Sequence, residues 1–418
     1  MEKGRAPSPA RQPPTSGFEI VGEEVLLEEQ SFSWYTSDTF CPVNIGDILQ
    51  SKYQVIGKLG YGSVSTAWLC RDLINHEDVT LKAYVSAHRQ ARNEFNVMNH
   101  ISHWSKRKSG SILVRTMRET FQVLGKKGPH QCLIHDPLGL TASQIQEMFG
   151  GKIPGSMLKA MVHYLLLALE FLHAEAHVVH TDIQGGNLML GLKNDSVLRD
   201  FEDEEWEEPS ARKFDGDYVI YASRELDIPD DTGPLILCDS GDAHYGENEY
   251  VGEVMPDLYR APEIVLGIPW NEKIDIWSVG VMASHRSAST RIAFLLASLL
   301  ISIQIWDLFE GKRLFTERLP NREESEAAHL ARMVALLGPP PPDLLKRGSK
   351  SGRYFDDRGN FIAKTKIPMG SLEDEEENLG GENRAIFIRF LRKMLQWRPE
   401  DRKTARELLQ DPWFKQPE

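Results

Sequence analysis

The chain has 418 residues, of which 41% are hydrophobic and 26% charged, and this composition is ordinary for a soluble globular protein of two or three domains. Its formal net charge of −13 disfavours nucleic acid or an anionic membrane as the main partner and favours basic proteins. The four cysteines lie far apart and match no metal-ligand spacing, so we expect a reducing compartment and no disulfide framework.

The first half of the chain carries strand patterns after an N-terminal tail. Residues 1–40 begin with a stretch rich in Pro, Ser and Gly, and we expect them to be disordered or extended. Apolar alternation over 53–84 predicts three strands, the first of which enters a glycine turn. A helix is predicted at 89–101, and a buried strand leading into a connector at 131–139.

The second half is predicted to be mainly helical, because 155–173 and 384–397 carry apolar residues with a 3.6-residue period. A small sheet-rich half followed by a larger helical half is typical of the α+β class. The apolar run Ile292–Ile305 has 14 residues, whereas a membrane-spanning helix needs about 20, so we do not interpret it as one.

Two acidic segments, 200–208 and 373–377, stand out in this half. The simpler interpretation of both is a solvated loop. The alternative is an acidic surface that attracts Arg-rich substrates.

Two motifs in the first half could hold a triphosphate. In LGYGSVS (59–65), Gly60 and Gly62 let the backbone approach phosphate closely, although such a glycine pair alone is weak support. In VTLK (79–82), Lys82 would reach the α- and β-phosphates, and Glu94 in the predicted helix is its natural ion-pair partner. Taken singly, Lys82 and Glu94 could equally be ordinary surface residues.

A third motif, HTDIQGGN (180–187), is far more specific. Asp182 would orient the acceptor hydroxyl and accept its proton, and Asn187 would hold a magnesium ion. An apolar strand that ends in Asp-Ser-Gly follows at 235–241, and its Asp239 is a hard oxygen donor of the kind that magnesium requires.

Taken in chain order, these motifs resemble those of eukaryotic protein kinases, and YRAPE (259–263), DIWSVG (275–280) and RPEDR (398–402) complete the series. The resemblance implies that Glu263 pairs with Arg402 and that Asp275 braces the catalytic loop. Four stretches resemble the SR-protein kinases of fungi in particular: CPVNIGD (41–47), GSVSTAWL (62–69), CLIHDPLG (132–139) and HTD (180–182).

The resemblance, which covers residues 40–415, implies a two-lobed kinase fold that uses ATP and Mg²⁺. It places the N-lobe at 41–138 and the C-lobe at 139–416, after the tail of 1–40. It implies a catalytic set of Lys82, Glu94, Asp182 and Gln184, and magnesium ligands Asn187 and Asp239. The implied ATP-binding residues are Leu59, Gly60, Gly62, Ser63, Val64, Ala67, Lys82, Asp136 and Leu138.

The resemblance also implies the substrate class, which is serine in basic, Arg/Ser-rich protein segments, with a link to mRNA processing. We expect a monomer in the cytoplasm and nucleus, with no direct nucleic-acid or membrane partner. The segment 242–260 contains no Ser or Thr, and Thr181 replaces the Arg that would bind an activation-loop phosphate. We therefore expect activity that does not require phosphorylation of that segment.

Three positions depart from the kinase pattern. Gln184 stands where the catalytic loop usually carries Lys, Ser240 replaces a large apolar residue, and His135 occupies the gatekeeper position. These departures leave open a pseudokinase that acts as a scaffold. A second alternative, a small-molecule phosphotransferase of kinase-like fold, typically lacks the Ala-Pro-Glu and Asp-Ile-Trp-Ser-Val-Gly motifs that are present here.

The insertion 283–304 interrupts the helix that starts at DIWSVG. Interrupting a buried central helix should disrupt its packing. We therefore interpret this stretch as an unspliced intron in the gene model, and the alternative is a genuine insertion. Transcript sequencing across the codons for 275–310 distinguishes them.

Overall fold

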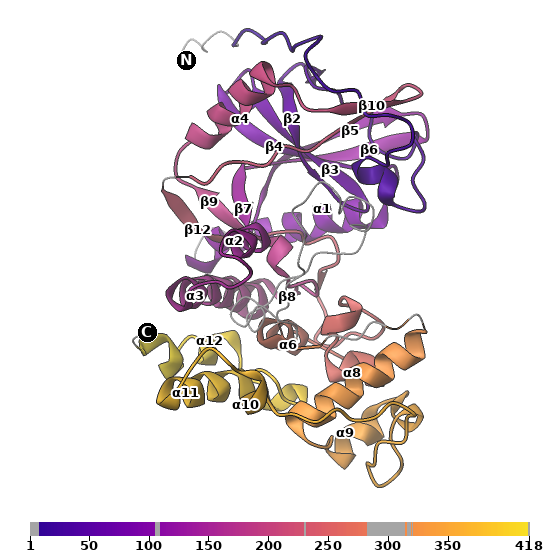
Figure 1. Cartoon of the computed structure of the whole chain (residues 1–418), viewed down its shortest axis with the longest axis vertical. Helices are drawn as coiled ribbons and strands as arrows, with labels where there is room; N and C mark the ends of the chain where they lie inside the picture. The colour runs from indigo at the N-terminus through magenta and orange to yellow at the C-terminus, as the bar shows by residue number, and fades with distance from the viewer. Residues whose placement is uncertain are drawn as a thin grey trace.

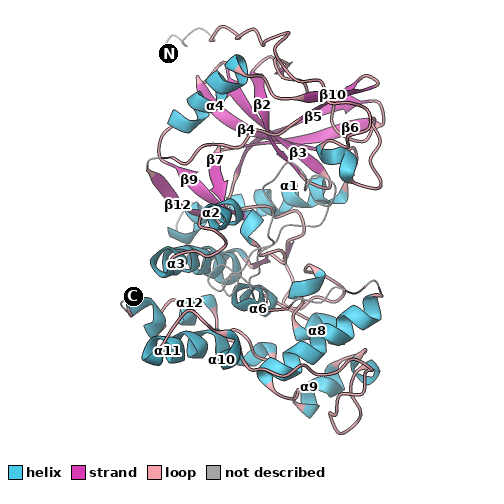
Figure 2. Ribbon diagram, in the orientation of Figure 1, coloured by secondary structure: helices cyan, strands magenta, loops and turns pink. Residues whose placement is uncertain are grey.

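The computed structural model describes residues 8–104, 109–229, 231–281, 314–315, 319 and 321–416. Strands gather in the upper part of the molecule and helices in the lower part (Figures 1 and 2). This arrangement confirms the α+β class and the two-lobed expectation. The insertion 283–304 and the apolar run 292–305 lie outside the described residues.

The upper lobe is built on an antiparallel sheet with the strand order β1-β2-β3-β4-β6-β5. The predicted strands of 53–84 are confirmed as β2, β3 and β4, and helix α1 (Arg89–Ser102) follows as expected. The strands are β1 (Ile48–Leu49), β2 (Tyr53–Tyr61), β3 (Ser65–Asp72), β4 (Glu77–Tyr84), β5 (Met117–Gly125) and β6 (Gly128–His135).

Two small sheets at the junction of the lobes carry the chemical motifs. One has the order β12-β9-β7, and the other pairs β13 with β8. HTDIQGGN lies between β8 and β9, and Asp239 follows β12 by two residues. The strands are β7 (Leu138–Thr141), β8 (Val178–Val179), β9 (Leu188–Leu192), β12 (Thr232–Leu237) and β13 (His244–Tyr245).

The lower lobe packs its helices around α3 and α6. α3 buries Leu158, Leu165 and Leu169 in the main core, and α6 buries Trp277. The second predicted helix is shifted, because α11 ends at Arg392 and the chain then turns so that Met394 and Leu395 stay buried. The described helices are α2 (Ala142–Met148), α3 (Gly155–Phe171), α5 (Pro262–Leu266), α6 (Lys273–Val281), α8 (Arg322–Leu337), α9 (Pro342–Arg347), α10 (Leu372–Glu375), α11 (Gly381–Arg392) and α12 (Ala405–Leu408).

Residues 8–40, which we expected to be disordered or extended, pack on the upper lobe. Leu27 and Phe40 are buried in a cluster with Tyr218. The fully buried Lys58 ammonium of β2 lies 3.0 Å from the Glu28 carboxylate and also binds Glu29. This segment is therefore not disordered, because its apolar and acidic residues have partners on β2 and on the hairpin of β10 (Arg212–Asp215) and β11 (Tyr218–Tyr221).

The acidic segment 200–208 is not a solvated loop, because most of it belongs to helix α4 (Ser196–Glu207). α4 lies beside the sheet of the upper lobe in Figure 1 and packs Phe201 against Ile56 of β2. Its Glu202 is buried and bonds to Arg71. Burial of Glu202 against an arginine shows that part of the acidic face binds the sheet.

The second acidic segment, 373–377, also differs from the expected loop, since it begins within α10. Glu373 lies 2.8 Å from the Arg392 guanidinium, and Glu375 lies 2.6 Å from that of Arg332. These carboxylates therefore join elements of the lower lobe.

Candidate active site

The phosphate-binding side chains expected from the sequence converge where β4, α1 and the segment after β12 meet. The Lys82 Nζ lies 3.0 Å from Glu94 Oε2 and 3.2 Å from Asp239 Oδ1. Glu94 is almost fully buried on α1, and the Lys82 side chain on β4 is only 15% exposed. Three residues far apart in the sequence thus form one cluster, which we call the phosphate anchor.

The charges of the phosphate anchor stabilise one another. Burial alone would lower the pKa of Lys82, but the carboxylates of Asp239 and Glu94 raise it well above its usual value. Burial alone would raise the pKa of Asp239, but the Lys82 ammonium and the Gly241 N–H hold it below its usual value. Lys82 is therefore cationic and Asp239 anionic at neutral pH, as binding of phosphate and magnesium requires.

The catalytic loop, residues 180–187, is held from below by Asp275 of α6. The buried Asp275 carboxylate accepts hydrogen bonds from the backbone N–H groups of His180 and Thr181, both at 2.8 Å. The expectation that Asp275 braces this loop is confirmed. Thr181 (φ 68°) and Asp239 (φ 61°) adopt left-handed backbone, which is uncommon outside glycine and clusters at functional sites.

Asp182 is oriented by two amides of its own loop. Its Oδ2 accepts hydrogen bonds from Gln184 Nε2 at 2.6 Å and from Asn187 Nδ2 at 2.8 Å. Burial, together with the nearby Asp239 carboxylate, raises the pKa of Asp182 to about 6. A carboxylate with a pKa near the operating pH is suited to accept a proton from a hydroxyl group.

The oxygen donors near the loop fit a magnesium ion. Asn187 donates its amide N–H to Asp182, and its amide oxygen is a ligand of the type that magnesium takes. The Asp239 side chain is 45% exposed and uses Oδ1 for Lys82 and the Gly241 N–H. Among the described residues, no group of three or more His, Cys, Asp or Glu side chains forms a metal cage. Magnesium takes most of its ligands from phosphate and water, and it neutralises charge on the phosphates when bound.

The glycine turn and the surrounding strands leave room for a nucleotide. A Cβ placed on Gly60 would meet no atom within 4 Å, and one on Gly62 would only reach Ser65 at 3.9 Å. Leu59, Val64 and Ala67 are half-buried around this space, and Ser63 is exposed at the tip of the turn.

The connector between the lobes differs in part from the expectation that Asp136 and Leu138 bind ATP. The backbone oxygen of Asp136 already accepts a hydrogen bond from the Arg115 guanidinium at 3.3 Å, which leaves it one further lone pair. Leu138 begins β7 and is half-buried. The gatekeeper His135 is fully buried, and burial lowers the pKa of its ring well below the usual value, so it is neutral.

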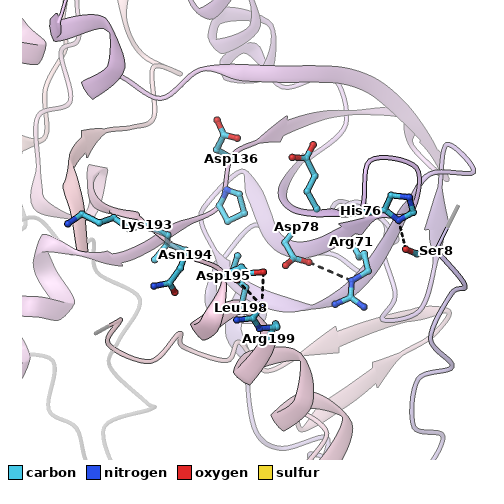
Figure 3. Close-up of a pocket in the computed structure, with 13 residues that line it drawn as sticks. Ser8, Arg71, His76, Asp78, Asp136, Lys193, Asn194, Asp195, Leu198 and Arg199 are labelled. Atoms are coloured by element: carbon cyan, nitrogen blue, oxygen red, sulfur yellow. Dashed lines mark hydrogen bonds and ion pairs between the residues drawn. The ribbon is translucent and has the colours of Figure 1, made fainter. Parts of the chain in front are cut away.

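A cavity of about 570 Å³ borders the connector but is separate from this site (Figure 3). Asp136 lies on one side of it, and Asp195 and Arg199 lie on the other. Its lining includes neither Lys82 nor Asp239. Arg199 pairs with Asp195 at 3.0 Å across its edge, and we assign the cavity no catalytic role.

Two polar residues at the site were not anticipated from the sequence. Tyr84 donates its hydroxyl to Glu94 Oε2, and its ring lies 5.0 Å from the Lys82 ammonium. Asn93 donates to the backbone oxygens of Gly241 and Ala243, both at 2.9 Å. Strand alternation could have indicated Tyr84, because residues two apart on a strand share a face.

Comparisons with known proteins agree with this geometry. Residues 228–414 match a family model described as the protein kinase domain. A serine/threonine protein kinase of Aspergillus fumigatus is 40% identical over 98% of this chain and 96% of its own length. The chain belongs to the serine/threonine protein kinases. Its relatives also include the serine/threonine-protein kinase SRPK of Physarum polycephalum, 26% identical over 93% of this chain and 91% of its own, and the protein kinase dsk1 of Schizosaccharomyces pombe, 22% identical over 94% and 86%. The kinase is therefore of the SR-protein-kinase-like type.

The kinase ties its activation segment to the lower lobe as the resemblance implied. The Arg402 guanidinium binds the Glu263 carboxylate through two hydrogen bonds of 2.6 and 2.7 Å, and both side chains are buried. Breaking a buried pair of this kind costs about 3–5 kcal/mol of stability, since the remaining charge is left without an opposite charge.

The Ser240 side chain is buried, as expected from its position after Asp239. It is 7% exposed, and within the described parts of the kinase its hydroxyl has no hydrogen-bond partner. A buried hydroxyl without a partner costs about 1–3 kcal/mol. The residue after Asp239 is therefore a weak point of the core between the lobes.

Proposed function

We propose that this kinase transfers the γ-phosphoryl group of Mg·ATP to serine hydroxyls in Arg/Ser-rich protein segments. The observation that carries the proposal is the phosphate anchor of Lys82, Glu94 and Asp239, with Asp182 close enough to Asp239 for its pKa to be raised. In-line phosphoryl transfer needs chiefly positioning and charge neutralisation, and these groups are suited to both.

Each residue has a role in this proposal. Lys82 binds the α- and β-phosphates, and Asp239 and Asn187 hold magnesium. Asp182 is ionised in most molecules at neutral pH, because its pKa is about 6, and it accepts a hydrogen bond from the serine hydroxyl. Gln184 holds the Asp182 carboxylate but adds no positive charge near the γ-phosphate.

The substrate class is supported by charge on the activation segment. Glu247 and Glu249 are exposed, and neither forms an ion pair with any described residue. Glu253 and Asp257, by contrast, are already in ion pairs. Glu253 lies 2.9 Å from Lys350, and Asp257 lies 2.9 Å from Arg260. Two of the four acidic residues therefore remain to attract a basic substrate.

The proposed substrate class suggests a role in mRNA processing, with the kinase in the cytoplasm and nucleus. Imaging of the tagged full chain tests the location, and exclusion from both compartments contradicts it.

Matched peptides test the function. The full chain is incubated with Mg·ATP and with peptides in which Ser alternates with Arg, with Ala or with Glu. We expect phosphate transfer to the Arg-Ser peptide, less to the Ala-Ser peptide, and none to the Glu-Ser peptide. Asp182→Asn protein, purified in the same way, controls for contaminating kinases. Absence of transfer by the wild type with retained Mg·ATP binding would establish the scaffold alternative, which Gln184 and Ser240 favour.

A further inference from the structure

Tyr84 occupies a special place beside the phosphate anchor. It is the last residue of β4 and lies on the same face of the strand as Lys82, two residues earlier. Its ring is buried with Ala91 of α1 and Leu133 of β6. This packing fixes the ring between the sheet and α1, and directs the hydroxyl to the carboxylate of Glu94.

The Tyr84 hydroxyl and the Lys82 ammonium share one oxygen of the anchor. Glu94 Oε2 accepts a hydrogen bond from each of them. Glu94 is 1% exposed, so water cannot replace a lost donor readily. A hydrogen bond to a buried charged group is among the stronger ones in a protein. The second donor therefore restricts where Oε2, and with it Lys82, can lie.

This kinase has a particular need for such a restraint. Its activation segment offers no Ser or Thr from 242 to 260, and the Thr181 hydroxyl donates instead to the backbone oxygen of Asp242 at 2.9 Å. The position of α1, which brings Glu94 to Lys82, must therefore be held by contacts that do not depend on Ser or Thr phosphorylation of this segment. Asn93 supplies one set at the start of the activation segment, and Tyr84 supplies another at β4.

We propose that Tyr84 is a positioning residue for phosphate binding, whose hydroxyl holds Glu94 so that Lys82 is set for the nucleotide without phosphorylation of the activation segment. This inference rests on the proposed function, because it concerns the same anchor.

The sheet offers a matched control for Tyr84. Tyr53 of β2 is also a buried tyrosine that donates its hydroxyl to a glutamate, Glu119, at 2.6 Å, beside a lysine, Lys52. The Lys52 ammonium lies 2.9 Å from the same Glu119 oxygen. This triad has the same donor and acceptor types as the anchor at a place that holds no residue of the active site, although its carboxylate is 43% exposed.

The first measurement is the affinity for Mg·AMP-PNP by isothermal titration calorimetry, with Tm recorded for each protein. We expect Tyr84→Phe to weaken binding by about tenfold, because ordering Glu94 and Lys82 then costs part of the binding free energy. Tyr53→Phe should lower Tm by less than Tyr84→Phe does, because water reaches the half-exposed Glu119, and should change binding by less than about twofold. Equal binding by Tyr84→Phe and wild type overturns the inference, as does an equal loss in both variants.

A double-mutant cycle separates positioning from general stabilisation. In a Glu94→Gln background, Tyr84→Phe should change nucleotide affinity by less than about twofold, because the group that it positions is already altered. The same tenfold loss in both backgrounds overturns the inference. Should the wild type bind no nucleotide at all, the proposed function itself fails. A wild type that binds and transfers phosphate, with an unaffected Tyr84→Phe variant, refutes only the role of Tyr84.

Discussion

The two sides of the candidate active site, which we call the upper wall (Lys82, Glu94, Asp239 and Tyr84) and the lower wall (Asp182, Gln184 and Asn187), differ in the polar groups that they carry. The upper wall carries Lys82 with two carboxylates and an additional tyrosine hydroxyl. The lower wall carries Asp182 held by two neutral amides, those of Gln184 and Asn187. The difference implies that Lys82 acts mainly on nucleotide binding and Asp182 on the rate of phosphoryl transfer, while Asn187 and Asp239, the proposed magnesium ligands, contribute to both.

The largest effect should come from the lower wall. Asp182→Asn removes the carboxylate that accepts the hydroxyl proton, and such groups contribute about 10²–10⁴-fold to rate. We expect kcat to fall by that factor in a peptide assay, while the Kd for Mg·ADP stays at the wild-type value. A parallel loss of nucleotide affinity would show that the walls are not separable.

The next largest effect is expected on stability, from the buried pair of Glu263 and Arg402 in the lower lobe. Glu263→Gln leaves the buried Arg402 without its carboxylate, and we expect a loss of about 3–5 kcal/mol in the free energy of unfolding. Urea denaturation measures it. Glu407→Gln, at a half-exposed pair with Lys403, is the matched control and should change stability by less than about 1 kcal/mol. Similar losses in both variants would contradict the role of the buried pair.

A smaller effect, and a gain of stability instead of a loss, is expected at Ser240. Ser240→Ala removes a buried hydroxyl that lacks a partner, so the kinase should gain about 1–3 kcal/mol of stability. Thermal unfolding would register this as a higher Tm. A lower Tm would mean that the hydroxyl is satisfied by a water molecule in solution.

The smallest effect concerns the acidic activation segment. Replacing Glu247 and Glu249 together by Gln should raise KM for the Arg-Ser peptide by a few fold, because exposed charges contribute about 0.2–1 kcal/mol each. The increase should shrink at high salt, where such charges are screened. Replacing Glu377, an exposed residue in another part of the lower lobe, should leave KM unchanged. An equal KM for wild type and the double variant would remove the support for basic substrates.

The sequence predicted those parts of the molecule that depend on local pattern. Alternation over 53–84 identified β2, β3 and β4, and the resemblance to protein kinases indicated that Lys82, Glu94 and Asp239 belong to one site. The parts that the sequence did not predict depend on burial against residues far away in the chain. α4 looked like a solvated loop because its acidic residues hide the apolar face that packs on β2.

The tail and Tyr84 were missed for a related reason. The tail begins with a stretch rich in Pro, Ser and Gly, and the order of residues 8–40 depends on partners such as Lys58 that only the folded sheet provides. Tyr84 reads as a strand former until α1 brings Glu94 within reach of its hydroxyl.

The upper wall carries the Lys82 ammonium, whereas the amides of the lower wall are neutral. The Gln184→Lys variant tests most directly whether this difference limits the rate. Steady-state phosphorylation of the Arg-Ser peptide and the Kd for Mg·ADP are measured for this variant and the wild type. One added donor near the γ-phosphate should raise kcat by at least about tenfold while Kd stays within about twofold. A kcat equal to or below that of the wild type would contradict the account.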